Sequence, residues 1–327
     1  MEIISVSSPR VSVVLPVYNG EALLSDAINS VLSQTMRDFE LIVLDDGSTD
    51  NSWKIIQGFS DSRIRAYSHD NIGLPATLNR GIALANAEYV ARLDHDDLML
   101  SSRLQKQCDY LDAHRDVVLL GTSAQIYEGD RPTARFHRHP TSSKALQLRL
   151  LFDNPFVHAS IIFRRDAIIK LGSYTQDNAR LPPEDYELWS RVARNFAVEN
   201  LAEVLTIYRE VPGSLSRVDS NPFIAKVLLF SAENLHAVLS PDFTLQDCRF
   251  LAAVYHGVDG ATSRLPRHKA LQMLRLATLR IGEFDCNAEF TSTQRAMTRL
   301  MKHRYARRYI PNAALAWLRS MRKRFGA

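Results

Sequence analysis

Two aspartates separated by one residue follow an apolar run in the first third of the chain. Asp94 and Asp96 come directly after residues 89–93 and are followed by Asp97. Carboxylate oxygens are hard ligands that suit Mg²⁺ or Mn²⁺, and two of them can hold one ion while phosphate oxygens and water fill its other positions. An isolated Asp-x-Asp is more often a solvated acidic loop. Because the two aspartates follow a predicted strand, we predict that Asp94 and Asp96 hold a metal ion that neutralises a departing diphosphate.

A second acidic cluster, residues 45–50, follows the apolar run 39–44. A carboxylate at this point can accept the N3 proton of a uracil or thymine ring. A turn that ends in a helix cap explains Ser48 and Asp50 without any ligand. For Asp46 we favour recognition of a base over a purely structural role.

A third pair of acids, Glu184 and Asp185, stands at a predicted helix start behind two prolines. One of these carboxylates could be the general base that removes a proton from an attacking hydroxyl group. Proline and acids in a first helical turn are also favourable for structural reasons alone, so both interpretations stay open. His158, just before a predicted strand, is a candidate contact for the acceptor, although a lone histidine is more often structural.

These side chains need a scaffold, and the first 100 residues indicate a parallel α/β sheet. Apolar runs alternate with helical patterns, as in βαβ units. Strands are predicted at residues 11–17, 39–44, 64–67 and 89–93, and helices at residues 21–34, 52–59 and 75–87. Ligands of such sheets bind outside the carboxyl ends of the strands, so we expect the polar strand ends to converge on one crevice.

The rest of the chain mixes strands and helices and then becomes helical. We predict helices at 102–114 and 185–196 and strands at 117–121, 159–164 and 204–208. The polar, proline-containing segment 218–222 predicts a boundary between a catalytic region, 1–220, and a second region, 221–327. Helices are predicted in the second region at residues 223–239, 245–255, 268–281, 293–305 and 312–324.

Charge divides the chain in the same way. The net charge is +4, but residues 221–327 hold 17 Lys/Arg against 7 Asp/Glu, whereas residues 1–220 hold 23 against 29. Trp317 beside the basic residues 319–324 suits a helix lying on anionic lipid, and a helical cap with a solvated basic face is the alternative. Nucleic acid is not expected, because no nucleic-acid-binding fold accompanies the positive charge.

The compartment is expected to be the cytoplasm, with peripheral binding to the inner face of the plasma membrane as a further expectation. The chain has no apolar run of the roughly 18 to 20 residues that a spanning helix needs, and no secretory signal pattern. Cys108, Cys248 and Cys286 are widely spaced and odd in number. We interpret them as reduced thiols rather than metal ligands or nucleophiles.

Taken in order, the motifs closely resemble the family 2 glycosyltransferases with a GT-A fold. The resemblance covers residues 11–217, about two thirds of the chain, and each motif is weak by itself. The matching strings are VSVVLPVYNG, SVLSQT, FELIVLDDGSTDNS, NIGLPATLNRGIALANAEYVARLDHDD, RLQKQ, PFVHASIIFRR and EDYELWSR.

The resemblance implies a fold class and a division of roles. The fold would be α/β, a GT-A type Rossmann-like and mostly parallel sheet flanked by helices, followed by an α-helical C-terminal region. The reaction would be a single inverting displacement from a nucleotide sugar, with UDP as the favoured carrier and Mn²⁺ or Mg²⁺ as cofactor. The implied site is Pro16, Tyr18, Asn19, Glu21, Asp46 and Asp94 for the nucleotide, Asp96 and Asp94 for the metal, and Asp185 with its neighbour Glu184 for catalysis.

One position departs from the family pattern. Related enzymes often have Tyr-Arg-x-His before Ser-x-Ser, and the histidine helps to hold the metal or diphosphate. Here Val211 stands at that position, whereas Ser214 and Ser216 remain. Carboxylates, phosphates and water, or His158, would have to replace the missing imidazole.

The expected function is therefore transfer of a sugar to a hydroxyl of a saccharide or lipid-linked saccharide, in surface polysaccharide or glycolipid synthesis. Two other classes compete with it. A nucleotidyltransferase also uses a parallel sheet and aspartates, but it usually has a glycine-rich phosphate loop that residues 16–20 lack. A non-catalytic sugar-nucleotide-binding or scaffold protein would keep the fold, and the presence of every required carboxylate argues against it.

Overall fold

The computed structural model describes residues 8–211, 223–282 and 287–307, and these fall into two compact units. The first takes the described residues up to Gln147 and those from Asn154 to Lys226. The second takes Leu148–Asp153 together with the described residues from Val227 on. The predicted boundary at residue 220 lies outside the described residues.

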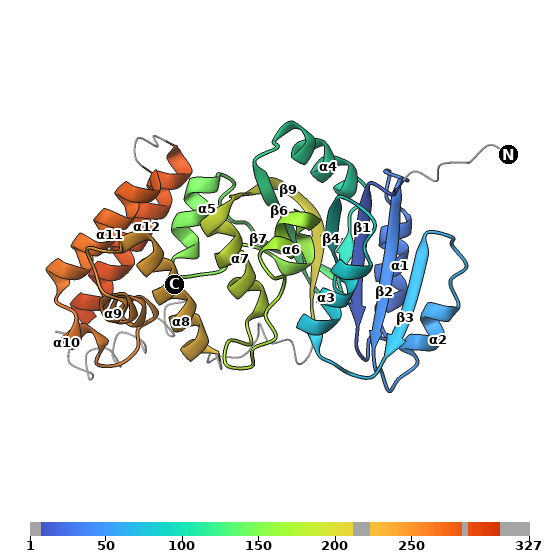
Figure 1. Ribbon diagram of the computed structural model, residues 1–327, viewed down its shortest axis with the longest axis horizontal. Coiled ribbons are helices and arrows are strands. Elements are labelled where there is room, and N and C mark those ends of the chain that lie inside the picture. The colour runs from blue at the N-terminus through green and yellow to red at the C-terminus, as the bar shows by residue number, and fades with distance from the viewer. Residues whose placement is uncertain (1–7, 212–222, 283–286, 308–327) are drawn as a thin grey trace. The chain divides into compact units, whose positions relative to one another are not determined.

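The first unit is built on one nine-stranded sheet of order β3-β2-β1-β4-β8-β6-β9-β5, with β7 paired to β6 (Figure 1). The strands β3, β2, β1 and β4 are parallel to one another, and β8 joins β4 in the antiparallel direction. The strands are β1 (Val11–Val17), β2 (Phe39–Asp46), β3 (Ile64–His69), β4 (Tyr89–Arg92), β5 (Leu98–Met99), β6 (Val117–Glu128), β7 (Arg131–His137), β8 (Ile162–Arg164) and β9 (Ala197–Glu210).

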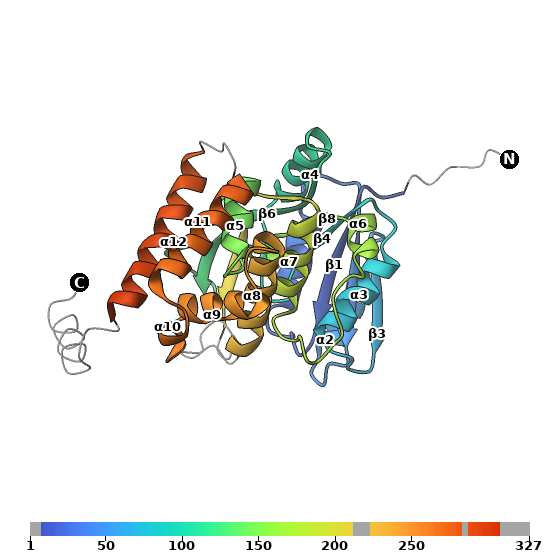
Figure 2. The same ribbon diagram turned by 60° about the vertical axis from the view of Figure 1, so that its left-hand side comes forward.

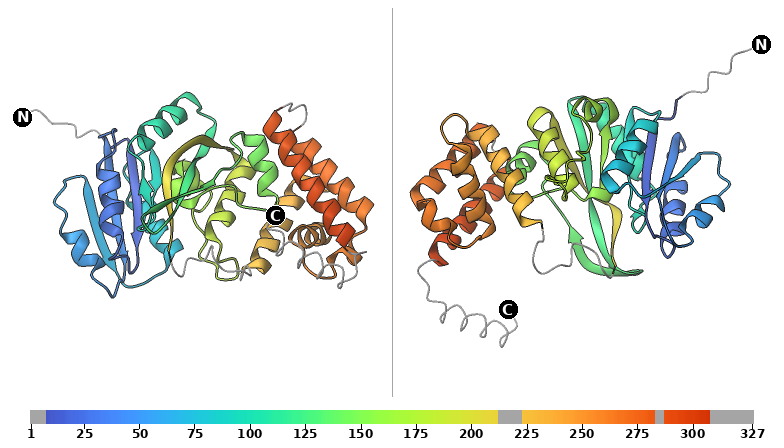
Figure 3. Two further views of the ribbon diagram at one scale, coloured as in Figure 1. Left: turned by 180° about the vertical axis from the view of Figure 1, so that it is seen from behind. Right: turned by 60° about the horizontal axis from the view of Figure 1, so that its bottom comes forward.

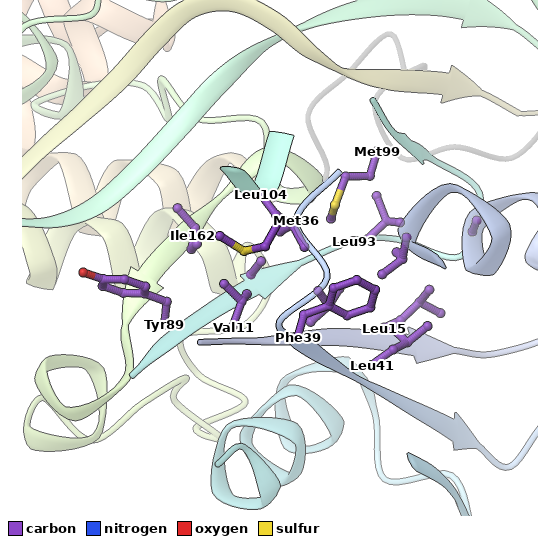
Figure 4. Close-up of a cluster of buried hydrophobic side chains, with 14 of the residues drawn as sticks. Val11, Leu15, Met36, Phe39, Leu41, Tyr89, Leu93, Met99, Leu104 and Ile162 are labelled. Atoms are coloured by element: carbon purple, nitrogen blue, oxygen red, sulfur yellow. The ribbon is translucent and has the colours of Figure 1, made fainter. Parts of the chain in front are cut away.

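Helices pack on both faces of the parallel half, which explains why β1, β2 and β4 are buried along their whole length. Alternate residues of β1 face opposite sides of the sheet. Val11, Val13 and Leu15 belong to the large apolar cluster shown in Figure 4, which also includes residues of α1 (Leu24–Leu32) and α4 (Arg103–Ala113). On the opposite face a Cβ added to Gly81 of α3 (Leu74–Leu84) would overlap the side chain of Val14, so the absence of a side chain allows this helix to approach closely.

The helices of the first unit lie in the connections between its strands. Those flanking the parallel strands are α1 (Leu24–Leu32), α2 (Ser52–Gln57), α3 (Leu74–Leu84) and α4 (Arg103–Ala113). Those that follow are α5 (Ser143–Leu150), whose last three residues belong to the second unit, the short 3₁₀ helix η1 (His158–Ser160), α6 (Arg165–Lys170) and α7 (Glu184–Asn195).

The second half of the sheet is mixed, which the sequence patterns did not indicate. β6 is antiparallel to β8 and parallel to β9, and β5 is antiparallel to β9. The α/β fold class with a helical C-terminal region is confirmed. The strands β6 and β9 are longer than predicted, because each carries polar residues that interrupt its apolar run.

The second unit is a group of helices that Figure 2 brings forward. They are α8 (Ile224–Leu239), α9 (Leu245–His256), α10 (Ala261–Arg264), α11 (Arg267–Gly282) and α12 (Ala288–Arg307), of which α11 and α12 lie side by side (Figure 3). Thr244 and Asp247 form a capping box that fixes the start of α9. Phe152 stacks on Tyr255, with ring centroids 3.9 Å apart, and thereby anchors the segment 148–153 to the helices.

Three expectations from the sequence concern membrane-spanning helices, the cysteines and the last predicted helix. Among the described residues, no helix has both the length and the apolar character that a membrane span requires. Cys108 and Cys248 are buried and free, whereas Cys286 lies outside the described residues. The predicted helix 312–324, with Trp317, also lies outside them.

Candidate active site

A pocket of about 340 Å³ lies at the carboxyl ends of β1, β2 and β4. Its lining includes Pro16 and Tyr18 after β1, Asp46 at the end of β2, and Asp94 with His95 after β4. Tyr18 is 49% exposed, so this residue is available to a ligand. The expected convergence of three strand ends is therefore present in the molecule.

Asp46 is 4% exposed and has a structural role as well as a place in the pocket. Its carboxylate accepts hydrogen bonds from the backbone N–H groups of Ile72 (2.8 Å) and Gly73 (3.0 Å), and His69 Nδ1 lies 3.5 Å away. Each carboxylate oxygen has a second lone pair. Asp46 can thus hold the loop before α3 in place and still accept a proton donor from a bound base.

Asn19 and Glu21 join the loop after β1 to the loop after β2. Asn19 Oδ1 accepts from the N–H of Thr49 at 2.8 Å, and Glu21 Oε2 accepts from the N–H of Asn51 at 2.9 Å. Asn19 adopts a positive φ of 51°, a conformation that asparagine tolerates better than most residues. Neither of these predicted nucleotide-binding residues is among those that line the pocket, and the structure gives both of them a role in joining the two loops.

Asp94 is paired with a buried arginine that the sequence motifs did not indicate. Arg92, the last residue of β4, is 2% exposed, and both of its terminal nitrogens donate to the Asp94 carboxylate. This bidentate pair fixes the orientation of Asp94 and offsets its charge. An arginine inside an otherwise apolar strand was the available sequence signal, since charged side chains are rarely buried without a partner.

Asp94, Asp96 and Asp97 present carboxylate oxygens that all lie within 4.8 Å of one another. Burial, followed by repulsion from Asp94, raises the pKa of Asp96 and raises that of Asp97 well above its ordinary value. Asp97 Oδ1 accepts from the N–H of Arg209 at 2.8 Å, whereas Oδ2 is buried without a partner among the described residues. This hard oxygen donor set fits a divalent cation, which would offset both burial and repulsion.

Two further buried arginines brace the acidic segment. Arg209, near the end of β9, is held by Asp26 (3.0 Å) and Asp130 (2.9 Å) while its backbone supports Asp97. Arg103 of α4 is fully buried and donates to three backbone carbonyls, those of Arg92, Ala159 and Ile161. Val211 lies just beyond β9 and is half-buried, whereas Ser214 and Ser216 are outside the described residues.

The first turn of α7 presents Glu184 and Asp185. Asp185 accepts from Asn154 Nδ2 at 2.7 Å and from the N–H of Tyr186 at 2.6 Å, so its carboxylate is held in one orientation. Burial raises the pKa of Asp185. Burial and then the neighbouring Asp185 charge raise the pKa of Glu184 to about 7.

His158 lies next to Glu184 but is largely enclosed. Its Nδ1 is 3.8 Å from Glu184 Oε1, its Nε2 is 2.8 Å from the Tyr174 hydroxyl, and its ring meets Trp189 edge to face. Burial and then the charge of Arg92 lower the pKa of His158 well below the ordinary value. The ring is therefore neutral near pH 7 and is largely a packing residue that borders the carboxylate pair.

Arg92 connects the two acidic groups electrostatically. Its charge lowers the pKa of both Glu184 and Asp185, and the charge of Asp94 raises that of Glu184. The acids after β4 and those that begin α7 therefore lie within electrostatic reach of the same buried guanidinium group. Such an arrangement can hold an anionic leaving group on one side and a proton acceptor on the other.

The comparisons with known proteins agree with this geometry. Residues 12–172 match the family model described as glycosyl transferase family 2. EpsE of Bacillus subtilis (strain 168), which carries a glycosyltransferase assignment, is 32% identical over 70% of this chain and 80% of its own length. The amylovoran biosynthesis glycosyltransferase AmsE of Erwinia amylovora is also 32% identical, over 59% of this chain and 74% of its own length.

A solved structure extends the likeness to nearly the whole fold. S. aureus TarS residues 1–349, in complex with UDP-GlcNAc, superposes with a TM-score of 0.60 over 91% of this chain and 92% of that one, at 15% identity. At this identity the likeness concerns the fold alone, and it confirms the predicted GT-A type architecture. The sequence relatives and the family model establish the rest: the chain belongs to glycosyl transferase family 2.

Proposed function

We propose that this chain transfers a sugar from a nucleotide diphosphate donor, with UDP as the carrier, to a hydroxyl group, with inversion at the anomeric carbon. The observation that carries the proposal is the shared location of two kinds of carboxylate. Asp46 and Asp94 line one pocket, and Arg92, the partner of Asp94, also acts electrostatically on Glu184 and Asp185. A donor bound in the pocket would thus have its leaving group beside the aspartates and its anomeric carbon toward α7.

The base of the donor is assigned to the end of the pocket between β1 and β2. Asp46 would accept the N3–H of uracil through a lone pair that the backbone of Ile72 and Gly73 leaves unused. Pro16 and the exposed residue Tyr18 would border the nucleoside. The complex of TarS with UDP-GlcNAc supports UDP as the carrier, although it concerns a distant relative.

The diphosphate is assigned to the acidic segment after β4. Asp96 would be the direct ligand of Mn²⁺ or Mg²⁺, and Asp94, held by Arg92, would complete the site. When bound, the cation supplies positive charge that stabilises the departing diphosphate. The unpaired oxygen of Asp97 makes this residue a further candidate ligand.

Asp185 is the proposed general base. Its carboxylate would take the proton of the acceptor hydroxyl while that oxygen attacks the anomeric carbon and the bond to the diphosphate breaks on the opposite side. Asn154 and the N–H of Tyr186 hold the carboxylate in position for this transfer. The pKa of Glu184 is about 7, so this side chain would gain or lose a proton near neutral pH and thereby change the negative charge next to Asp185.

The acceptor is proposed to be a saccharide or a lipid-linked saccharide of surface polysaccharide synthesis. AmsE, a relative named for amylovoran biosynthesis, supports the polysaccharide class.

The helix α12 carries the exposed residues Arg295, Arg299 and Lys302, which suit contact with an anionic membrane surface. Flotation with anionic vesicles should weaken about fivefold for each of these residues changed to glutamine, at about 1 kcal/mol per charge. Equal binding to neutral vesicles would refute the membrane contact.

Donor hydrolysis with a set of nucleotide sugars, with and without Mn²⁺, tests the proposed reaction. Asp185→Asn should bind UDP as tightly as wild type and lose turnover by about 100-fold or more, within the range for a general base. Asp96→Ala should lose the metal-dependent part of donor binding. Normal turnover by Asp185→Asn would reject the assigned base, and UDP binding without turnover on any donor or acceptor would favour a non-catalytic protein.

A further inference from the structure

A second pocket, of about 360 Å³, lies within the helical unit, far in the chain from the acidic motifs. Its polar lining comes from Arg149 at the end of α5, Asp153, the last turn of α9, and Arg304 of α12. Met297 and Leu300 of α12 form an apolar wall. None of these residues has a role in the proposed transfer, and the volume is within the range of small-molecule sites.

The two arginines of this pocket differ in how their charge is offset. Arg149 Nη2 is 3.4 Å from Asp153 Oδ2, so this guanidinium already has a carboxylate partner. Arg304 is half-buried and forms no ion pair with any described residue, and its Nε is buried without a hydrogen-bond partner among them. A buried donor without an acceptor is unfavourable. The pocket therefore has a guanidinium group whose charge and donors an anionic ligand would satisfy.

The backbone beneath Arg304 is shaped to admit this side chain. Gly257 ends α9 in the left-handed conformation, with φ of 74°, and a Cβ at this position would overlap the Arg304 Nη1 atom. The guanidinium thus lies against the C-terminal end of α9, where the helix dipole favours a positive charge. Because His256 in the same turn has its pKa lowered by burial, the positive charge of the pocket near pH 7 comes from the arginines.

The carboxylate of Asp153, which also lines this pocket, can recognise hydroxyl groups. Asp153 Oδ2 accepts from the Tyr255 hydroxyl at 3.2 Å, while no described residue donates to Oδ1. A carboxylate oxygen without a donor, a guanidinium group and apolar side chains in one pocket suit a ring that has several hydroxyls and one acidic substituent. We propose that this pocket binds a sugar that carries a carboxylate or a phosphate group, with the acidic group on Arg304 and a ring hydroxyl on Asp153.

This site goes beyond the proposed transfer, because it does not involve the donor pocket or the acids of α7. An acidic sugar of a saccharide chain and a sugar phosphate have the same recognition chemistry here. Glucuronate and glucose 6-phosphate represent the two sources, and glucose and inorganic phosphate each supply one half of that chemistry. Titration calorimetry of the full chain with these four probes, in the absence of nucleotide, measures the pocket separately from the transferase reaction.

Both acidic sugars, or one of them, should bind at least tenfold more tightly than glucose and than inorganic phosphate. Arg304→Gln should weaken that binding by about 10- to 100-fold, the loss expected for a charge-assisted hydrogen bond. Arg275→Gln removes an exposed arginine of α11 outside the pocket and is the matched control, which should bind as wild type does. Binding of glucuronate would identify an acidic sugar of a saccharide chain as the ligand, and binding of glucose 6-phosphate would identify a sugar phosphate.

A second variant protects the test against misfolding. Ala296→Phe fills the pocket and leaves both arginines in place, and the variant should fold because Ala296 is exposed. It should abolish binding of the acidic sugar with a melting temperature close to that of wild type. Equal affinity for glucose and the acidic sugars, an equal loss in Arg275→Gln and Arg304→Gln, or full binding by Ala296→Phe would each overturn the proposal. The outcome is independent of donor turnover, so either proposal can fail without the other.

Discussion

Replacing Glu184 by glutamine should stabilise the protein at pH 8 and have much less effect at pH 5. Burial and the adjacent Asp185 raise the pKa of Glu184 from 4.5 to about 7 in the folded protein. The folded state therefore holds this proton more tightly than the unfolded chain does. This proton contributes its full stability below the pKa that Glu184 has in the unfolded chain. The contribution is lost as the pH rises through the pKa that Glu184 has in the folded protein.

The size of the effect follows from the two pKa values. The difference between 4.5 and about 7 corresponds to roughly 3.4 kcal/mol of unfolding free energy when the group is fully ionised. Integration of the two titrations from pH 5 to pH 8 gives about 2.5 kcal/mol. The Glu184 side chain is only 15% exposed, so solvent screening reduces this value little. A neutral glutamine avoids the loss, and Glu184→Gln should gain about 2.5 kcal/mol over wild type across this range.

Urea unfolding of both proteins at pH 5, 6.5 and 8 measures this gain directly. Glu203→Gln is the control, because the Glu203 side chain is 55% exposed and should show no comparable dependence on pH. Transfer activity of Glu184→Gln should fall while stability rises, as expected where a functional site stores unfavourable burial. A difference between variant and wild type that is the same at pH 5 and pH 8 would refute the reasoning.

Three other substitutions test separate parts of the account. Gly81→Ala forces a Cβ into Val14 and should destabilise the protein by about 1 to 3 kcal/mol, seen as a lower melting temperature; an unchanged or higher value would contradict the close packing of α3. Arg103→Met removes the donors of three buried carbonyls and should lower the unfolding free energy by at least about 3 kcal/mol, whereas a loss below 1 kcal/mol would show that other groups satisfy them. Asp46→Asn should weaken UDP binding by about 10-fold or more in calorimetry, and unchanged affinity would remove Asp46 from base recognition.

The sequence predicted best those elements in which one periodic pattern decides the structure. The first strand was predicted at residues 11–17 and occupies Val11–Val17, because every residue of β1 is buried between two layers of helices. Polar residues at the ends of β1, β2 and β4 were correctly expected to share a crevice, since parallel strands present their carboxyl ends at one edge. Roles of individual residues in binding and catalysis remain predictions.

The parts that were missed depend on contacts between distant segments. β7 consists largely of exposed residues and includes Pro132, so no alternation of apolar residues marks it as a strand. β9 begins at Ala197, although only residues 204–208 were predicted, because Glu199, Asn200 and Glu203 interrupt its apolar pattern. Arg209 binds Asp26 and Asp130, which are far from it in the sequence, and a spacing rule cannot supply such partners.

Electron paramagnetic resonance of Mn²⁺, titrated into the protein with and without UDP, tests the proposed meeting of nucleotide, metal and carboxylates most directly. The predicted result is a bound Mn²⁺ signal that strengthens with UDP, disappears in Asp96→Asn and is unchanged in Asp185→Asn. A bound signal that is equally strong in wild type and Asp96→Asn, or that UDP does not affect, would contradict the proposal that the acids after β4 hold the metal of a nucleotide-sugar donor.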